Sequence, residues 1–209
     1  MAVRFASSSR VKNDLPRYSN FWDGTTVFSP FTATGSYDAL ASYTVPSGGV
    51  STITFAGLPT GGQYQHLQIR AILKTVANSN SDGNGIWRVN GDTGSNYSYH
   101  ELQGNGSSAS AGGAGSISAF TLGYTTGSGA GTSNIFAAYI FDILDYASTV
   151  KNKTVRHIDG YDLNGAEGSI WFRSDAWYNA ASAINSITFS NTTNNFAQYS
   201  QISVYGIRG

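Results

Sequence analysis

The chain has 209 residues, which is enough for one large domain or for one domain with an arm. It contains no cysteine, so disulfides and thiolate zinc sites are excluded. Charged residues make up only 11% of the chain, and 12 basic residues balance 12 acidic ones, so nothing attracts nucleic acid or an acidic membrane over long range. We also expect no membrane insertion, because there is no run of about 18 apolar residues.

The first 30 residues differ in composition from the rest of the chain. They contain four basic residues, two acidic residues and five aromatic residues without a regular period. We predict an extended N-terminal arm over residues 1–30, followed by a β-sandwich domain over residues 31–209. The arm either folds back on its own domain or docks on a neighbouring subunit. The arm residues predicted to bind a partner are Arg4, Phe5, Arg10, Arg17, Tyr18, Phe21 and Trp22.

Alternation of apolar and polar residues begins at Tyr37 and predicts three strands, over residues 40–45, 50–55 and 66–74. In the third, alternate apolar residues are expected to face the core, namely Leu67, Ile69, Ala71 and Leu73.

The middle of the chain alternates between short strands and turn-forming residues. Residues 86–89 are a predicted strand, and Asn90-Gly91 after them is typical of a type I′ hairpin turn. Residues 97–102 and 117–124 are further predicted strands. The stretch 104–116 consists mostly of Gly, Ser and Ala, so we predict a flexible surface loop there.

The longest apolar stretch begins at Ile135 and predicts the central strand of the fold. Both of its faces are apolar, which favours a strand covered on both sides; a buried helix over residues 135–146 is the alternative. Residues 154–161 alternate clearly and place His157 and Asp159 on one face. We predict a long antiparallel hairpin in the middle of the fold.

The C-terminal part adds predicted strands over residues 170–173, 183–189 and 200–207, with a single turn over residues 177–180. About ten short strands with regular turn signals and no amphipathic helix predict an all-β fold. We expect an antiparallel, jelly-roll-like β-sandwich.

Catalytic motifs are not apparent in the sequence. No G-x-S-x-G occurs, and neighbours such as His100 and Glu101 point to opposite faces of a strand. Asp159, Asp162 and Asn164 are a weak calcium pattern, because Asp and Asn are also ordinary turn residues. We therefore predict no catalytic residue, no cofactor and no metal site, although a carboxylate pair from different strands remains open.

Several aromatic residues have two alternative interpretations, as core residues or as exposed rings that stack on sugars. They are Trp87, Tyr97, Tyr99, Trp171 and Tyr178.

A family resemblance lies mainly in the C-terminal third. Its segments are Asp159-Gly160-Tyr161-Asp162, Ser174-x-x-Trp177, Ala183-Ile184-Asn185-Ser186-Ile187, Asn195-Phe196-Ala197-Gln198-Tyr199-Ser200 and Val204-Tyr205-Gly206-Ile207. Together with upstream strands they resemble a group of small virion proteins of tailed phages, especially phages of cyanobacteria and other marine bacteria. The resemblance covers roughly residues 37–207. It implies a jelly-roll-like sandwich on the outside of a virion.

The functional expectation that follows is a non-enzymatic virion protein that decorates or cements a capsid. Its neutral surface does not repel copies of itself, which favours a homo-oligomer. The expected partners are other capsid or tail proteins. The alternative is an adhesin at a tail tip or fibre that binds carbohydrate on the host surface. A polysaccharide hydrolase is a third alternative and needs two carboxylates brought together in a groove.

Overall fold

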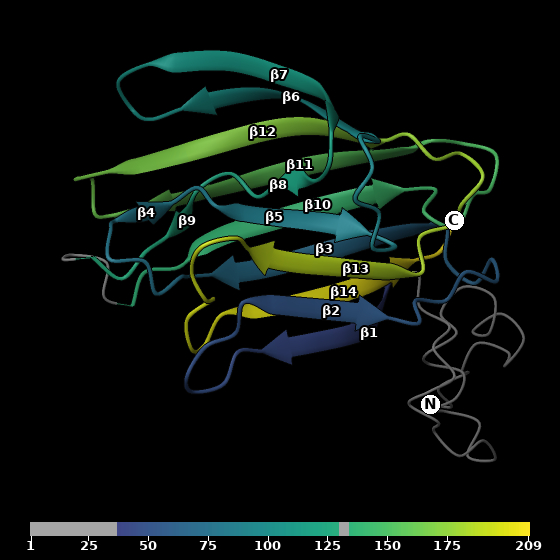
Figure 1. The fold of residues 1–209 in the computed structure, drawn as a ribbon, viewed down its shortest axis with the longest axis horizontal. Helices are drawn as coiled ribbons and strands as arrows, with labels where there is room; N and C mark the ends of the chain where they lie inside the picture. Colours follow the sequence, from purple (N-terminus) through teal and green to yellow (C-terminus); the bar gives the residue numbers. More distant parts are fainter. Residues whose placement is uncertain (1–36, 130–133) are drawn as a thin grey trace, which may run out of the picture.

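The computed structural model describes residues 37–129 and 134–209, and the predicted arm lies outside these ranges. The described residues form strands and loops, and none of them belongs to a helix that could cross a membrane. Two antiparallel sheets pack face to face (Figure 1). The chain is therefore an all-β antiparallel sandwich, as the sequence predicts.

The larger sheet has eight strands and forms the back layer in Figure 1. Every neighbouring pair in it is antiparallel. In spatial order its strands are β1 (Tyr37–Thr44), β14 (Gln201–Ile207), β3 (His66–Leu73), β10 (Ala137–Leu144), β11 (Lys153–Asp162), β12 (Gly168–Trp177), β6 (Tyr97–Gly104) and β7 (Ala109–Ile117).

The smaller sheet has four strands and covers only part of the larger one. Its strands, in spatial order, are β2 (Thr52–Ala56), β13 (Ser186–Asn191), β5 (Gly85–Val89) and β8 (Phe120–Thr121). A separate pair consists of β4 (Ser81–Asp82) and β9 (Thr125–Thr126). In Figure 1, β12, β6 and β7 extend beyond β8, so the inner face of the large sheet is not fully covered on that side.

The core lies between the two sheets and is rich in aromatic rings. Trp87 of β5 packs against Phe120, Phe141 and Phe189, with ring centroids 4.2, 5.4 and 6.0 Å away. All four side chains are buried. Aromatic pairs of this kind contribute about 0.5–1.5 kcal/mol each beyond the area that they bury. This cluster holds the edge strand β8 against the large sheet.

The predicted hairpin is confirmed, and β10 pairs with both β11 and β3 near the middle of the large sheet. The helical alternative is wrong. The expectation that β10 is covered on both sides is also wrong for the described part of the chain, where the small sheet packs on one face of the large sheet and no second layer covers the other. Tyr139 and Phe141 are buried, whereas Ile140 is 40% exposed and Leu144 is 36% exposed. The apolar residues of β10 therefore make two surfaces, and one of them is open.

Three local predictions are corrected by the structure. Most of the predicted loop 104–116 is strand β7, because its small residues pair through their backbone with β6. Asn90 and Gly91 have positive φ values of 52° and 64°, as a type I′ turn requires, but they join strands of different sheets. Trp177 ends strand β12 and does not begin a turn.

Candidate functional site

A cluster of charged side chains lies on the inner face of the large sheet. In the strand register His157 of β11 lies opposite Arg173 of β12, which lies opposite Glu101 of β6. Asp159 and Asp175 are two residues further along β11 and β12 and so face the same side. The register therefore brings together one histidine, one arginine and three carboxylates that are remote in the sequence. We call these five residues the ionic cluster.

The ionic cluster is connected by short contacts between its titratable side chains. His157 Nε2 lies 3.2 Å from Asp159 Oδ1, and His157 Nδ1 lies 3.6 Å from Asp175 Oδ2. Arg173 Nε lies 3.5 Å from both Asp175 Oδ1 and Glu101 Oε2. Glu101 keeps 15% of its side chain exposed, whereas the other four side chains have at most 1% exposed. The cluster is thus closed at the histidine and open at Glu101.

Burial controls the protonation of the ionic cluster. Desolvation raises the pKa of Asp159 to about 8, although the Arg173 guanidinium opposes the shift. Desolvation also raises the pKa of Glu101 and lowers the pKa of His157. At neutral pH Asp159 therefore carries its proton and His157 is neutral. Both nitrogens of His157 and both oxygens of Asp159 nevertheless lack a well-formed hydrogen bond.

The chemistry of the cluster is limited by access. His157 and Asp159 have no exposed side-chain surface, so a substrate does not touch them in this conformation. Gly123, with a φ of +73°, lies directly against Asp159, and a Cβ atom at this position would be 2.5 Å from Asp159 Oδ2. The backbone between β8 and β9 therefore closes the cluster from the side of the small sheet.

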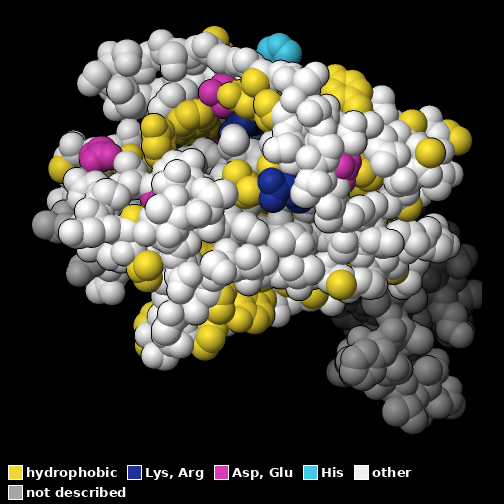
Figure 2. Space-filling view, in the orientation of Figure 1, with side chains coloured by type: hydrophobic (Ala, Val, Ile, Leu, Met, Phe, Trp, Pro, Cys, Tyr) yellow, Lys and Arg dark blue, Asp and Glu magenta, His cyan; other side chains and the backbone are white. Residues whose placement is uncertain are grey.

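Beside the cluster, the inner face opens into a groove. Arg173 lies at its base, where its Cζ is 4.2 Å from the ring centroid of Tyr99 and its Nη1 donates to the carbonyl oxygen of Thr121. Trp171 and Tyr124 meet edge to face, with centroids 5.6 Å apart. Figure 2 shows a hollow below β6 and β7 that contains hydrophobic, acidic and basic side chains. We call this the aromatic groove.

A third feature is a row of apolar side chains on the outer face of the large sheet. The register aligns Ile140, Ile158, Phe172, Leu102 and Ala111 across five neighbouring strands, from β10 to β7. The first four are 40%, 44%, 49% and 62% exposed. The row borders a shallow depression of about 700 Å³. We call it the outer apolar row.

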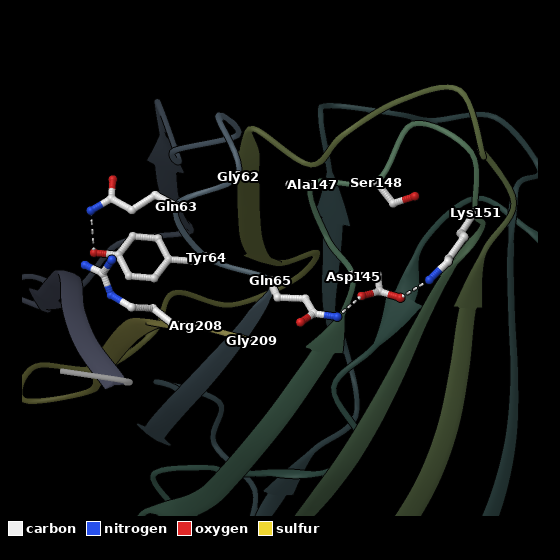
Figure 3. Close-up of a pocket in the computed structure, with 10 residues that line it drawn as sticks. All are labelled: Gly62, Gln63, Tyr64, Gln65, Asp145, Ala147, Ser148, Lys151, Arg208 and Gly209. Carbon is white, nitrogen blue, oxygen red and sulfur yellow. Dashed lines mark hydrogen bonds and ion pairs between the residues drawn. The ribbon is translucent and has the colours of Figure 1, made fainter. Parts of the chain in front are cut away.

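A separate pocket of about 550 Å³ lies at the end of the sandwich near the C-terminus (Figure 3). Asp145 accepts hydrogen bonds there from Lys151 Nζ at 2.7 Å and Gln65 Nε2 at 3.0 Å. On the other side, the guanidinium of Arg208 lies over the ring of Tyr64. These polar groups already bind one another, so the pocket offers a ligand few unoccupied partners.

The sequence predictions relate to these sites in different ways. The seven predicted partner residues of the arm, Arg4, Phe5, Arg10, Arg17, Tyr18, Phe21 and Trp22, lie outside the described residues. Asp159 and Asp162 lie on opposite faces of β11, so the calcium pattern does not assemble there. Within residues 37–129 and 134–209 no group of three acidic, histidine or cysteine side chains is placed to hold a metal ion.

Of the five aromatic residues considered for sugar binding, Trp87 and Tyr97 are core residues. Trp171 and Tyr99 are half-buried in the aromatic groove, and Tyr178 is exposed elsewhere. The ionic cluster was not predicted from the sequence. The signal for it was the spacing His157-x-Asp159 and Arg173-x-Asp175, which places charges at inward positions of two strands.

Comparison of the chain with protein-family models, with curated proteins and with solved structures found no match.

Proposed function

We propose that the protein is a non-enzymatic structural protein of a phage virion that decorates or cements the capsid surface. The resemblance of the C-terminal third to virion proteins of tailed phages supports this proposal. The composition supports it as well, because a neutral and charge-poor chain is suited to close contact with other proteins.

The observation that carries the proposal is the outer apolar row. Single exposed apolar residues are common, but contiguous exposed patches on soluble proteins usually mark interaction sites. Ile158 and Phe172 are neighbours within the row, on β11 and β12. Burial of such a patch contributes roughly 25 cal/mol per Å² of apolar surface removed from water, so a partner protein gains affinity by covering it.

Enclosure of the ionic cluster supports the non-enzymatic part of the proposal. An acid or base catalyst has to come within hydrogen-bond reach of the reacting group. His157 and Asp159 are shielded from solvent on every side, so they are placed to organise the sheet and not to contact a substrate.

The experiment that tests the proposal is incorporation into particles. The double variant Ile158→Thr/Phe172→Ser removes the centre of the outer apolar row while leaving the core unchanged. We expect a folded protein whose occupancy on purified particles falls at least tenfold. Tyr178→Ser, which alters another exposed aromatic residue, is the matched control and keeps full occupancy. Normal occupancy of the double variant contradicts the role of this face.

The arm is tested separately by deletion of residues 1–30. If the arm holds the protein on the particle, the truncated chain folds but does not join it. Incorporation at normal occupancy assigns attachment to the sandwich alone.

A second candidate function is that of an adhesin that binds carbohydrate on the host surface. The specific observation in its favour is the aromatic groove, where Tyr124 packs on Trp171 and Trp171 lies opposite Gln103 in the strand register. Particles that carry a groove variant such as Tyr124→Ala test it, because an adhesin variant lowers adsorption to host cells without lowering occupancy.

A further inference from the structure

The aromatic groove owes its opening to the mismatch between the two sheets. The small sheet ends at β8, which pairs with β5 through Ile86 and Trp87 only. The strands β12, β6 and β7 continue beyond this edge (Figure 1). Side chains on the inner face of β6 are therefore only partly buried, namely Tyr99, Glu101 and Gln103.

Small residues on β7 keep the groove wide. Ser110, Gly112 and Ala114 lie opposite Gln103, Glu101 and Tyr99 in the register and so share their face. A Cβ atom on Gly112 would lie 3.1 Å from Glu101 Oε1. The absence of a larger side chain on Gly112 thus leaves the carboxylate of Glu101 uncovered.

The other wall presents aromatic surface. The rings of Trp171 and Tyr124 are inclined by 69°, and Tyr124 is 39% exposed. Trp171 Nε1 donates to Ser169 Oγ at 3.1 Å, which fixes the ring. Two inclined rings form a corner into which one flat, partly apolar ring fits, with one face stacked and one edge in contact.

The polar groups of the groove are held in place, but part of their hydrogen-bonding capacity is unsatisfied. The Arg173 side chain is 1% exposed, yet its Nη2 and Nε have no hydrogen-bond acceptor. Glu101 contacts Arg173 through Oε2 at 3.5 Å and keeps its remaining acceptor capacity on the open side. Gln103, the next inward residue of β6, adds an amide that both donates and accepts.

Charge identifies the class of ligand. Three carboxyl groups surround one guanidinium, and Arg173 is already paired with Glu101 and Asp175. An anionic ligand would meet an excess of acceptors, because the guanidinium of Arg173 is already paired. A ligand with many hydroxyl groups and an apolar ring face fits both the acceptors and the aromatic corner.

We propose that the aromatic groove binds an uncharged saccharide, with the sugar ring against Trp171 and Tyr124 and its hydroxyl groups on Glu101 and Gln103. Arg173 acts as a positioning residue that holds the carboxylate of Glu101. This inference rests on the second candidate function, and it names the ligand class and the residues that recognise it.

The test is direct binding by the purified full-length chain. The probes are uncharged oligosaccharides of glucose, mannose, galactose and xylose, with an oligouronate as the acidic comparison. Saturation-transfer NMR identifies bound sugars, and titration gives Kd. We expect at least one uncharged probe to bind, with no binding of the oligouronate. Failure of all the uncharged probes at millimolar concentration, or a preference for the oligouronate, overturns the inference.

Three groove variants locate the site. Trp171→Ala, Tyr124→Ala and Glu101→Gln are each expected to weaken binding at least tenfold, and Tyr178→Ala is the matched control outside the groove. Near-UV circular dichroism checks that each variant is folded. If Trp171→Ala does not fold, Tyr124→Ala alone tests whether the groove binds the sugar. Unchanged affinity in folded Tyr124→Ala refutes the assignment. Sugar binding by the purified chain without an effect on host adsorption rejects the adhesin function but not the saccharide site.

Discussion

Ile158 and Phe172 lie directly opposite each other on β11 and β12, and both point away from the sandwich core. Their inward neighbours along the same strands are His157 and Arg173, members of the ionic cluster. At these positions β11 and β12 therefore have apolar residues on the outside and titratable residues on the inside, opposite to the usual arrangement in a sandwich.

The outer apolar row is expected to contribute little to folding. Phe172→Ala removes a side chain that is 49% exposed, so the free energy of unfolding should fall by less than about 1 kcal/mol. Phe141→Ala removes a fully buried ring of the core, and here we expect a loss of about 3–5 kcal/mol. Urea denaturation measures both. Comparable losses in the two variants would show that the outer face is a structural part of the fold.

Arg173 is expected to be essential for stability, because it balances the carboxylates of Glu101 and Asp175. Arg173→Ala leaves these groups uncompensated in a buried environment, so the free energy of unfolding should fall by about 3–5 kcal/mol. Arg156→Ala, an exposed arginine of the same sheet, is the control and should change it by less than about 0.5 kcal/mol. A small effect of Arg173→Ala would mean that water reaches the cluster and screens it.

Asp159 should make stability decrease as the pH rises from 7 to 8.5. Its folded pKa of about 8 exceeds the value of 3.8 for the free side chain, so in this window the folded state holds a proton that the unfolded state has lost. Because the unfolded state binds fewer protons than the folded state, the free energy of unfolding falls by about 1–2 kcal/mol across the window and levels off above the folded pKa. Burial lowers the pKa of His157, so its contribution rises with pH and lies below the window.

Asp159→Asn provides the control for this pH dependence, because the amide keeps the shape of the protonated acid but does not titrate. Chemical denaturation at several pH values should give a flat profile for the variant between pH 7 and 8.5. An identical slope in the wild type and the variant would assign the effect to another group.

Gly123 is expected to tolerate no side chain. Gly123→Ala combines a positive φ with a contact between Cβ and Asp159, so we expect a loss of more than about 2 kcal/mol. Gly165 has a similar φ of +78° but no atom near its Cβ position, and Gly165→Ala should cost only about 1 kcal/mol for the backbone. Thermal unfolding distinguishes the two. Equal losses would show that the contact with Asp159 relaxes without cost.

The hairpin of β10 and β11 could be predicted from sequence because its apolar run is long and its second strand alternates clearly. The open outer face could not be predicted. Apolar residues at Ile140 and Leu144 indicate that something covers them, but not whether this cover belongs to the same chain. The sandwich class could also be predicted, because strand signals repeat along the chain without a helical period.

The ionic cluster was beyond prediction because it depends on strand order. Glu101 belongs to the same cluster as His157 only because β6 pairs with β12. No local sequence pattern specifies that pairing. Residues 104–116 were predicted as a loop, so the strand that pairs with β6 on its other side was also not expected. Gly and Ser there have low strand propensity, and pairing with β6 overrides it.

The single-layered part of the sheet has a mechanical consequence. The hairpin of β6 and β7 is attached to the remainder of the large sheet through β12 alone, and β7 has almost no buried side chain. Strand β7 forms a flap that can detach without melting the aromatic centre around Trp87, whereas β6 is anchored to that centre by the buried ring of Tyr97, 4.7 Å from Phe120. Amide hydrogen exchange should therefore be orders of magnitude faster in β7 than in β10, and ligand capture beneath the flap should slow it.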